Sequence, residues 1–182
     1  MEAIRPKGTS FLEEVNRLGK QTIQHCYQCQ KCSVGCPVAY AMDYAPNQLI
    51  RMIQYGMEDE VLASSTIWLC ASCETCTTRC PNEVDVAHLM DILRQMALKR
   101  RIPAKERNIP EFHKAFLSSV KKGGRVYELG MMGIYKLKTR TFFKDMQLGR
   151  DMFNRGKINI LPHRIQGKKE IKDIFKNAKR GK

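Results

Sequence analysis

The sequence contains no long hydrophobic run. None of its apolar stretches approaches the ~20 residues that a helix needs to cross a bilayer, so we expect no direct membrane insertion. The first residues, 1–8, lack the apolar core of a secretory signal. These absences predict a cytoplasmic protein, whose contact with any membrane would come through a partner.

Signals for paired β-strands are also missing, because there is no Asn-Gly turn between alternating apolar runs. Apolar residues recur instead with helical spacing, as they do over residues 11–18. Ser10 and Glu13 have the spacing of a capping box at the start of this helix. Gly19 is suited to end it in a left-handed conformation. We therefore predict an all-α protein.

Further helices follow from proline, glycine and capping signals. Pro46 suits a first helical position, and Gly56 ends the apolar stripe that follows it. A short helix is predicted over about residues 58–63, and Asp85 is expected to cap a long helix. Two prolines bracket a predicted linker at residues 103–110.

The last third of the chain is predicted to hold shorter helices. Residues 125–155 contain helical pieces that we expect to be broken at Gly130, Gly133 and Gly149. A loop over residues 158–162 then precedes a basic terminal helix.

Charge is unevenly distributed. Residues 1–98 carry 8 Lys and Arg against 11 Asp and Glu, a net charge of −3. Residues 99–182 carry 24 against 7, a net charge of +17. This asymmetry indicates two functional regions: a cofactor-binding domain over residues 1–102 and a basic helical extension over residues 103–182.

The basic extension has three interpretations. Nucleic-acid binding is the usual meaning of so much positive charge, but the sequence has no nucleic-acid-binding motif. A solvated basic face is the simplest alternative. Docking onto acidic partner subunits is favoured, because the glycine-rich stretch after residue 123 is unsuited to a large independent core.

All eight cysteines lie between residues 26 and 80, and the basic half has none. They form two copies of one pattern, C-x2-C-x2-C-x3-C-P: Cys26-Tyr-Gln-Cys29-Gln-Lys-Cys32-Ser-Val-Gly-Cys36-Pro37 and Cys70-Ala-Ser-Cys73-Glu-Thr-Cys76-Thr-Thr-Arg-Cys80-Pro81. Disulfides are disfavoured in a reducing compartment. Zinc sites usually take two separated C-x2-C pairs around one ion. The third cysteine, the fourth cysteine and the proline of each run favour two [4Fe–4S] clusters.

In two-cluster ferredoxins with this spacing, the fourth cysteine of each run binds the cluster of the other run. By that resemblance we expect cluster A on Cys26, Cys29, Cys32 and Cys80. We expect cluster B on Cys70, Cys73, Cys76 and Cys36. Cys36 and Cys70 are separated by 33 residues, with the helix that begins at Pro46 between them. This helical insert resembles the α-helical ferredoxin fold rather than the small βαββαβ ferredoxins.

The sequence as a whole resembles the C subunit of heterodisulfide reductase. The resemblance rests on both cysteine runs, the helix that begins at Pro46, the tripeptides Trp68-Leu-Cys70 and Val84-Asp-Val, and the basic stretches around 161–164 and 168–176. The cysteine pattern alone is shared with iron–sulfur subunits of anaerobic glycerol-3-phosphate and succinate dehydrogenases. The latter also carry a [2Fe–2S] domain, for which this chain has no C-x4-C-x2-C run.

The resemblance implies a role in a hetero-oligomeric complex. The C subunit of that family passes electrons from a flavin- and iron–sulfur-containing A subunit to a catalytic B subunit. The B subunit reduces the mixed disulfide of coenzyme M and coenzyme B in methane-producing archaea. An alternative is the electron-transfer subunit of another anaerobic, quinone-linked dehydrogenase. A nucleic-acid-binding iron–sulfur protein is a third hypothesis, although we expect no nucleic acid.

The residues themselves favour electron transfer without catalysis. There is no G-x-G-x-x-G dinucleotide fingerprint, and every cysteine is used by the two runs, so none is left as a nucleophile. Lys31 and Arg79 are expected near cluster A, and Glu74 near cluster B. Because net charge is one determinant of potential, we expect cluster A to have the higher potential.

Overall fold

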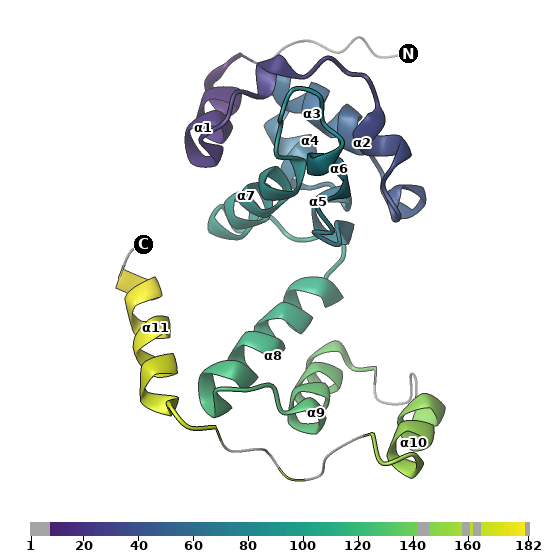
Figure 1. Cartoon of the computed structure of the whole chain (residues 1–182), viewed down its shortest axis with the longest axis vertical. Helices are drawn as coiled ribbons and strands as arrows, with labels where there is room; N and C mark the ends of the chain where they lie inside the picture. Colours follow the sequence, from purple (N-terminus) through teal and green to yellow (C-terminus); the bar gives the residue numbers. More distant parts are fainter. Residues whose placement is uncertain (1–7, 142–145, 158–160, 162–164, 181–182) are drawn as a thin grey trace. The chain divides into compact units, whose positions relative to one another are not determined.

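The computed structural model describes residues 8–141, 146–157, 161 and 165–180, with the side chains of 179 and 180 excepted. Over these residues the secondary structure is helical and contains no strand, so the all-α prediction is confirmed. The chain divides into two compact units, residues 1–107 and 108–182 (Figure 1). The assignment of the second unit to partner docking stays a prediction.

The first unit contains seven α-helices and two 3-10 turns among its described residues. In chain order these are α1 (Ser10–Gly19), η1 (Ile23–His25), α2 (Lys31–Val34), η2 (Ala39–Ala41), α3 (Pro46–Gln54), α4 (Glu58–Leu62), α5 (Thr66–Leu69), α6 (Thr75–Thr78) and α7 (Val86–Lys99).

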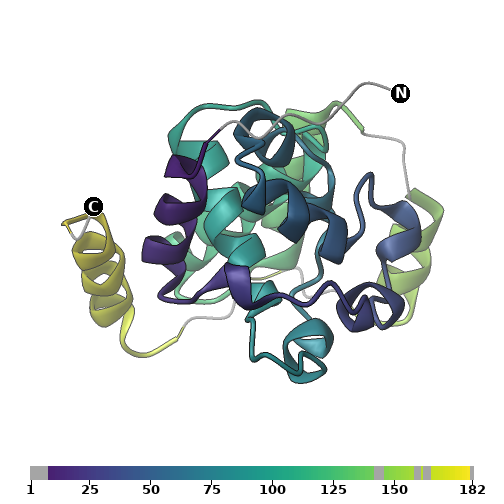
Figure 2. The same cartoon turned by 90° about the horizontal axis from the view of Figure 1, so that it is seen from above.

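Helix α7 is the main packing element of the first unit. The Asp85 side chain accepts a hydrogen bond from the His88 backbone N–H at 2.9 Å, which confirms the predicted cap. Helices α1, α4, α5 and α6 all pack against α7, and Figures 1 and 2 both show α1 beside it. Each fully buried aliphatic side chain contributes about 1.5–3 kcal/mol. The largest of them are Ile23, Leu49, Ile50, Ile53, Leu62, Ile67, Leu89, Met90 and Leu93.

The two end signals predicted for α1 were wrong. The helix begins at Ser10, so this serine is the first helical residue and not the cap. The N-cap is Thr9, whose side chain makes no capping hydrogen bond. At the other end Lys20, not Gly19, takes the left-handed conformation, with φ 50°. Gly19 serves packing instead, since a Cβ there would lie 3.1 Å from Ile92 Cδ1 on α7.

The other boundaries of the first unit follow the sequence closely. Pro46 is the first residue of α3, as predicted. Gly56 follows the helix with a φ of +71°, a conformation that glycine adopts at little cost. A Cβ at this glycine would also lie very close to the Gly8 carbonyl oxygen, so the position requires glycine for two reasons.

The second unit contains four helices among its described residues: α8 (Asn108–Gly123), α9 (Glu128–Thr139), α10 (Met146–Asn154) and α11 (Lys168–Arg180). Pro110 lies inside the first turn of α8, so the predicted linker is shorter than residues 103–110. The predicted glycine breaks were wrong, because α9 continues through Gly130 and Gly133 and α10 through Gly149. Most of the predicted loop at 158–162 lies outside the described residues.

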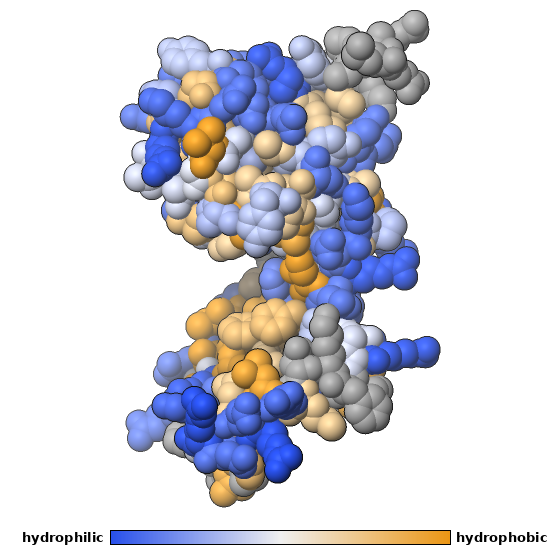
Figure 3. Space-filling model, turned by 90° about the vertical axis from the view of Figure 1, so that its right-hand side faces the viewer, coloured by the Kyte–Doolittle hydropathy of each residue, from blue (hydrophilic) through white to orange (hydrophobic). Residues whose placement is uncertain are grey.

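The second unit has a small core. Helices α8 and α9 pack through an edge-on contact between Phe112 and Tyr135, with ring centres 5.7 Å apart. Glu111 on α8 joins the two helices by accepting from Lys138 on α9 at 3.2 Å, and it also accepts from Lys114 on its own helix at 2.7 Å. Several large apolar side chains of α8 and α9 remain exposed, and Figure 3 shows hydrophobic and hydrophilic residues intermingled on this unit. They include Phe116, Leu117, Met132 and Leu137.

Candidate metal centre

Both cysteine runs fold into the same tight loop. Gln28 and Gln30, on either side of Cys29, have left-handed backbones with φ of 59° and 64°. Ser72 and Glu74 flank Cys73 in the same way, with φ of 49° and 62°. Left-handed conformations are uncommon for residues other than glycine, and four at matched positions show a shared backbone design.

Each loop is followed by one turn of helix that carries its third cysteine. This turn is α2 in the first run and α6 in the second, and the two turns pack against each other (Figure 1). Gly35 and Arg79 occupy equivalent places at the ends of these turns, and a Cβ on Gly35 would lie 2.7 Å from Arg79 Nη1. The two runs therefore meet face to face.

The structure sorts the eight cysteines into two groups of four, each around one cavity. The first cavity encloses about 370 Å³, including its opening to solvent. Its cysteines are Cys26, Cys29, Cys32 and Cys80. The second cavity has the same volume, about 370 Å³. Its cysteines are Cys36, Cys70, Cys73 and Cys76. Each cavity thus takes three cysteines from one run and the fourth from the other.

Val86 separates the two cavities. This residue is 1% exposed, begins α7 and lines both of them. The other apolar lining differs between the cavities, since Ile50 and Val84 face the first while Met42 and Met90 face the second. A single side chain therefore forms a wall common to both groups of thiols.

Polar contacts also reach the sulfur atoms of the first cavity. Gln28 Nε2 donates to Cys26 Sγ at 3.5 Å, and the Val84 backbone N–H donates to Cys80 Sγ at 3.3 Å. The pKa of the Cys32 thiol is raised, and burial is the largest cause of this shift. A metal that binds this sulfur must therefore displace a firmly held proton.

The second cavity has a different polar environment. The Thr75 hydroxyl lies 3.4 Å from Cys73 Sγ, and this hydrogen bond lowers the pKa of the exposed Cys73 thiol. Burial raises the pKa of the Cys76 thiol, as it does for Cys32 in the first cavity.

The chemistry of the donor sets fits iron–sulfur cubanes. Four thiols line each cavity, and neither lining includes a histidine or an aspartate. Four cysteines are the usual ligands of a [4Fe–4S] cluster, in which each thiolate binds a different iron. Within the part of the chain that the structure describes, no three Cys, His, Asp or Glu side chains converge on the position of a single metal ion.

The other residues singled out in the sequence fall into three places. Lys31 lines the first cavity, where it was expected. The Arg79 guanidinium lies against Gly35, directly before Cys36 of the second cavity, so its charge is not confined to the first. Trp68 is buried at 3% exposure and packs in the core.

Sequence reasoning missed Asn47 and Val86. Both line cavities at the starts of long helices, α3 and α7. Helical periodicity identified those helices, but nothing in the local sequence indicated that their first turns face the cysteines.

Comparison with known proteins identifies the same region. Residues 22–84, which include both cysteine runs, match the 4Fe–4S dicluster domain family. The chain is 32% identical over 114 residues to the C subunit of the H2:CoB–CoM heterodisulfide,ferredoxin reductase of Methanothermobacter marburgensis, covering 63% of this chain and 58% of that protein. The chain is a homologue of the heterodisulfide reductase C subunits.

Other C subunits show the same relationship. The second iron–sulfur C subunit of the CoB–CoM heterodisulfide reductase of Methanocaldococcus jannaschii is 29% identical over 135 residues, covering 69% of this chain and 72% of that protein. The iron–sulfur C subunit of Methanopyrus kandleri is 34% identical over 103 residues, covering 52% of this chain and 54% of that protein. The chain thus spans little more than half the length of several C subunits that it matches.

The similarity to these C subunits and the dicluster match together account for the cofactor. This C-subunit homologue carries a domain for two [4Fe–4S] clusters, and its eight cysteines line two cavities, four in each. Among the described residues, no helix is both long enough and apolar enough to cross a membrane.

Proposed function

We propose that the chain is an electron-transfer subunit of a heterodisulfide reductase-like complex. In this proposal cluster A is bound by Cys26, Cys29, Cys32 and Cys80. Cluster B is bound by Cys36, Cys70, Cys73 and Cys76. The observation that carries the proposal is the sorting of cysteines from both runs into two groups of four that share Val86. When bound, the two clusters would each accept and release one electron at a time.

The positions of the cysteines suit a path through the domain. Each group contains one exposed cysteine, Cys29 in the first and Cys73 in the second. An electron can therefore enter near one and leave near the other. Val86, which is buried and lines both cavities, places an apolar side chain beside both groups.

We propose two partners of different chemistry. A flavin- and iron–sulfur-containing A subunit supplies electrons, and a catalytic B subunit receives them. Reduction of a disulfide to two thiols consumes two electrons and two protons, so the chain must deliver two electrons in succession. The proposal is supported by the relatives, whose names describe C subunits of heterodisulfide reductases.

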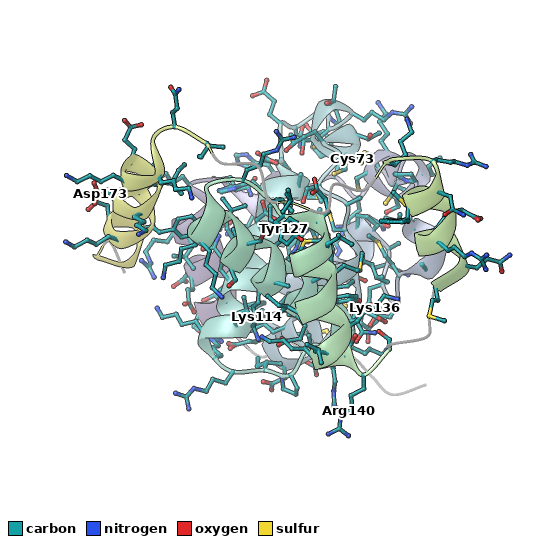
Figure 4. All side chains as sticks on the ribbon, turned by 90° about the horizontal axis from the view of Figure 1, so that it is seen from below. Cys73, Lys114, Tyr127, Lys136, Arg140 and Asp173 are labelled. Carbon is teal, nitrogen blue, oxygen red and sulfur yellow. The ribbon has the colours of Figure 1, made fainter. Side chains whose placement is uncertain are left out.

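The second unit is proposed to dock the chain onto these partners. Its positive charge suits contact with acidic surfaces. Its exposed apolar side chains would be buried against a partner. One basic side chain follows the end of α9, where Figure 4 shows Arg140 pointing outward. Electrostatic docking of this kind weakens as salt screens the charges.

Isolation of the native complex without oxygen tests the proposal. We expect a flavin-containing subunit and a disulfide-reducing subunit to co-purify with this chain at low salt and to separate from it at high salt. Recovery of the chain with a quinone-reactive membrane subunit would favour the dehydrogenase alternative. Retardation of nucleic acid in a gel at physiological salt would contradict the proposed role of the basic unit.

A further inference from the structure

The residues that follow the third cysteine of each run make the same first contact. The backbone N–H of Asn47, in the first turn of α3, donates to Ser33 Oγ at 3.0 Å. The backbone N–H of Ala87, in the first turn of α7, donates to Thr77 Oγ1 at 3.3 Å. Both runs are thus attached to the start of a long helix in the same way.

In the first run, further hydrogen bonds continue to a cysteine. The Ser33 hydroxyl donates to Asn47 Oδ1 at 2.6 Å, and Asn47 Nδ2 donates to Gln28 Oε1 at 3.3 Å. Gln28 Nε2 then donates to Cys26 Sγ at 3.5 Å. Every donor points in the same direction, so the group dipoles polarise one another and their positive end faces the sulfur. We call these three side chains, Ser33, Asn47 and Gln28, the amide relay.

In the second run, the corresponding hydrogen bonds end on an anion. The Thr77 hydroxyl group donates to Asp85 Oδ1 at 2.9 Å. Ser72, which occupies the place of Gln28, instead accepts from Arg94 Nη2 at 3.2 Å. The two halves therefore share a backbone design, but the side-chain hydrogen bonds described here end on a sulfur in the first half and on a carboxylate in the second.

We propose that the amide relay makes cluster A the cluster of higher reduction potential. This inference rests on the proposed function, since it requires both clusters. A reduced cluster carries one more negative charge than an oxidised one, so an N–H donor on a ligand sulfur stabilises the reduced state more. Hydrogen bonds to sulfur and net charge are established determinants of the potential of these clusters.

A second N–H donor to a sulfur of the first cavity acts in the same direction. The Val84 N–H group donates to Cys80 Sγ, and Lys31 adds a positive charge to the lining of the first cavity. The sulfur of Cys73, in the second cavity, has the Thr75 hydroxyl as its neighbour. A cation approaches the second side as well, since Arg94 Nη2 donates to the Cys70 carbonyl at 3.1 Å. The difference between the cavities therefore lies in the two N–H donors to sulfurs of the first, against a hydroxyl group beside Cys73 in the second.

The difference gives electron transfer a direction within the chain. An electron that arrives at cluster B moves to cluster A, because the cluster of higher potential holds it more strongly. Entry then lies near Cys73 and exit near Cys29, which are the exposed cysteines of the two groups.

An anaerobic redox titration followed by EPR tests the inference on the purified full chain. Gln28→Gly removes the final donor while keeping a residue that tolerates the left-handed backbone at this position. We expect the reduction potential of the upper one-electron step to fall. The change corresponds to about a fivefold lower equilibrium constant for reduction, the equivalent of ~1 kcal/mol for one hydrogen bond. Asn47→Ala should move the same step in the same direction by less, because Gln28 keeps its amide but loses its anchor.

Thr75→Val is the matched control, since it removes the hydroxyl beside Cys73. This variant should decrease the reduction potential of the second, lower-potential step and leave the potential of the upper step unchanged. An unmoved upper step in Gln28→Gly, or a shift of the lower step instead, would overturn the inference. Iron content is measured on every sample: full iron with unmoved steps contradicts the amide relay alone, whereas wild-type chain without two clusters contradicts the proposed function.

Discussion

Gly35 and Arg79 occupy equivalent positions in the two cysteine runs, and they lie against each other. A Cβ on Gly35 would stand 2.7 Å from Arg79 Nη1 and 3.2 Å from the Lys31 carbonyl oxygen. The φ of Gly35 is −86°, an ordinary value, so this glycine is not needed for its backbone conformation but leaves room for the Arg79 side chain. This contact brings the fourth cysteine of each run toward the loop of the other.

The contact predicts a coupled effect on stability. Gly35→Val should destabilise the protein by about 1–3 kcal/mol, because the added side chain must displace Arg79 and crowds the Lys31 carbonyl. The same change should cost at least ~0.5 kcal/mol less when combined with Arg79→Ala, which removes the opposing side chain. Anaerobic thermal unfolding of the two single variants and the double variant measures the difference. Additive effects would contradict a direct contact.

Replacement of Val86 should change the reduction potentials of both clusters. Val86→Ala opens the wall common to the cavities, and water that enters stabilises the more negative reduced state of each cluster. Both steps of a redox titration should therefore shift upward. Val84→Ala is the matched control, since Val84 lines the first cavity and its backbone N–H survives the substitution. A response of one step alone in the Val86 variant would show that this residue does not lie between the clusters.

Asp43 predicts a pH-dependent contribution to stability. Its carboxylate accepts from the Thr66 hydroxyl at 2.7 Å and from the Ser65 backbone N–H at 2.8 Å, at the start of the helix that leads to Cys70. Although burial opposes them, these hydrogen bonds hold the pKa of Asp43 well below its usual range.

A carboxyl with a lowered pKa stabilises the folded state above its unfolded pKa of about 3.9, and this contribution disappears as the pH falls further. Asp43→Asn should therefore unfold at a lower temperature than wild type at pH 7, by an amount that corresponds to about 1–3 kcal/mol. The gap should narrow only below about pH 4. Asp91→Asn, at a half-exposed carboxylate on α7, should show no comparable gap. A gap that stays constant down to pH 3 would contradict the role assigned to Asp43.

The Gln21 side chain links two segments that are distant in sequence, and its removal should lower the stability of the fold. Its side chain donates to the Asp85 carbonyl at 3.1 Å and accepts from the Asp85 N–H at 2.8 Å, across 64 residues of sequence. Gln21→Ala leaves both backbone groups without this partner and should cost about 1–3 kcal/mol. Gln24→Ala, three residues away at an exposed position, should cost much less. Equal losses in thermal unfolding would contradict a specific role for Gln21.

Much of this architecture could be predicted from local sequence. Spacing alone indicated the eight cysteines as candidate cluster ligands. Pro46 and Asp85 correctly marked the starts of α3 and α7. These signals are local, because a proline or a cap acts within one turn of its own helix.

The remaining features depend on residues that are distant in sequence. Gly19 packs closely against Ile92, 73 positions later, and does not take the left-handed conformation at the end of its own helix. The link from Asn47 to Gln28 spans 19 residues, and no periodicity encodes it. The four left-handed residues that shape the cysteine loops, glutamines, a serine and a glutamate, are not the glycines or asparagines that usually indicate this conformation.

The central claim is that thiols from both runs hold a pair of iron–sulfur cubanes, and metal analysis of anaerobically purified protein tests it most directly. Two [4Fe–4S] clusters require about eight iron atoms and about eight inorganic sulfides per chain. We predict that stoichiometry in the native chain, with both values falling when Cys80 is replaced by serine. A chain that contains zinc in place of iron, or far less iron than two clusters require, would contradict the account.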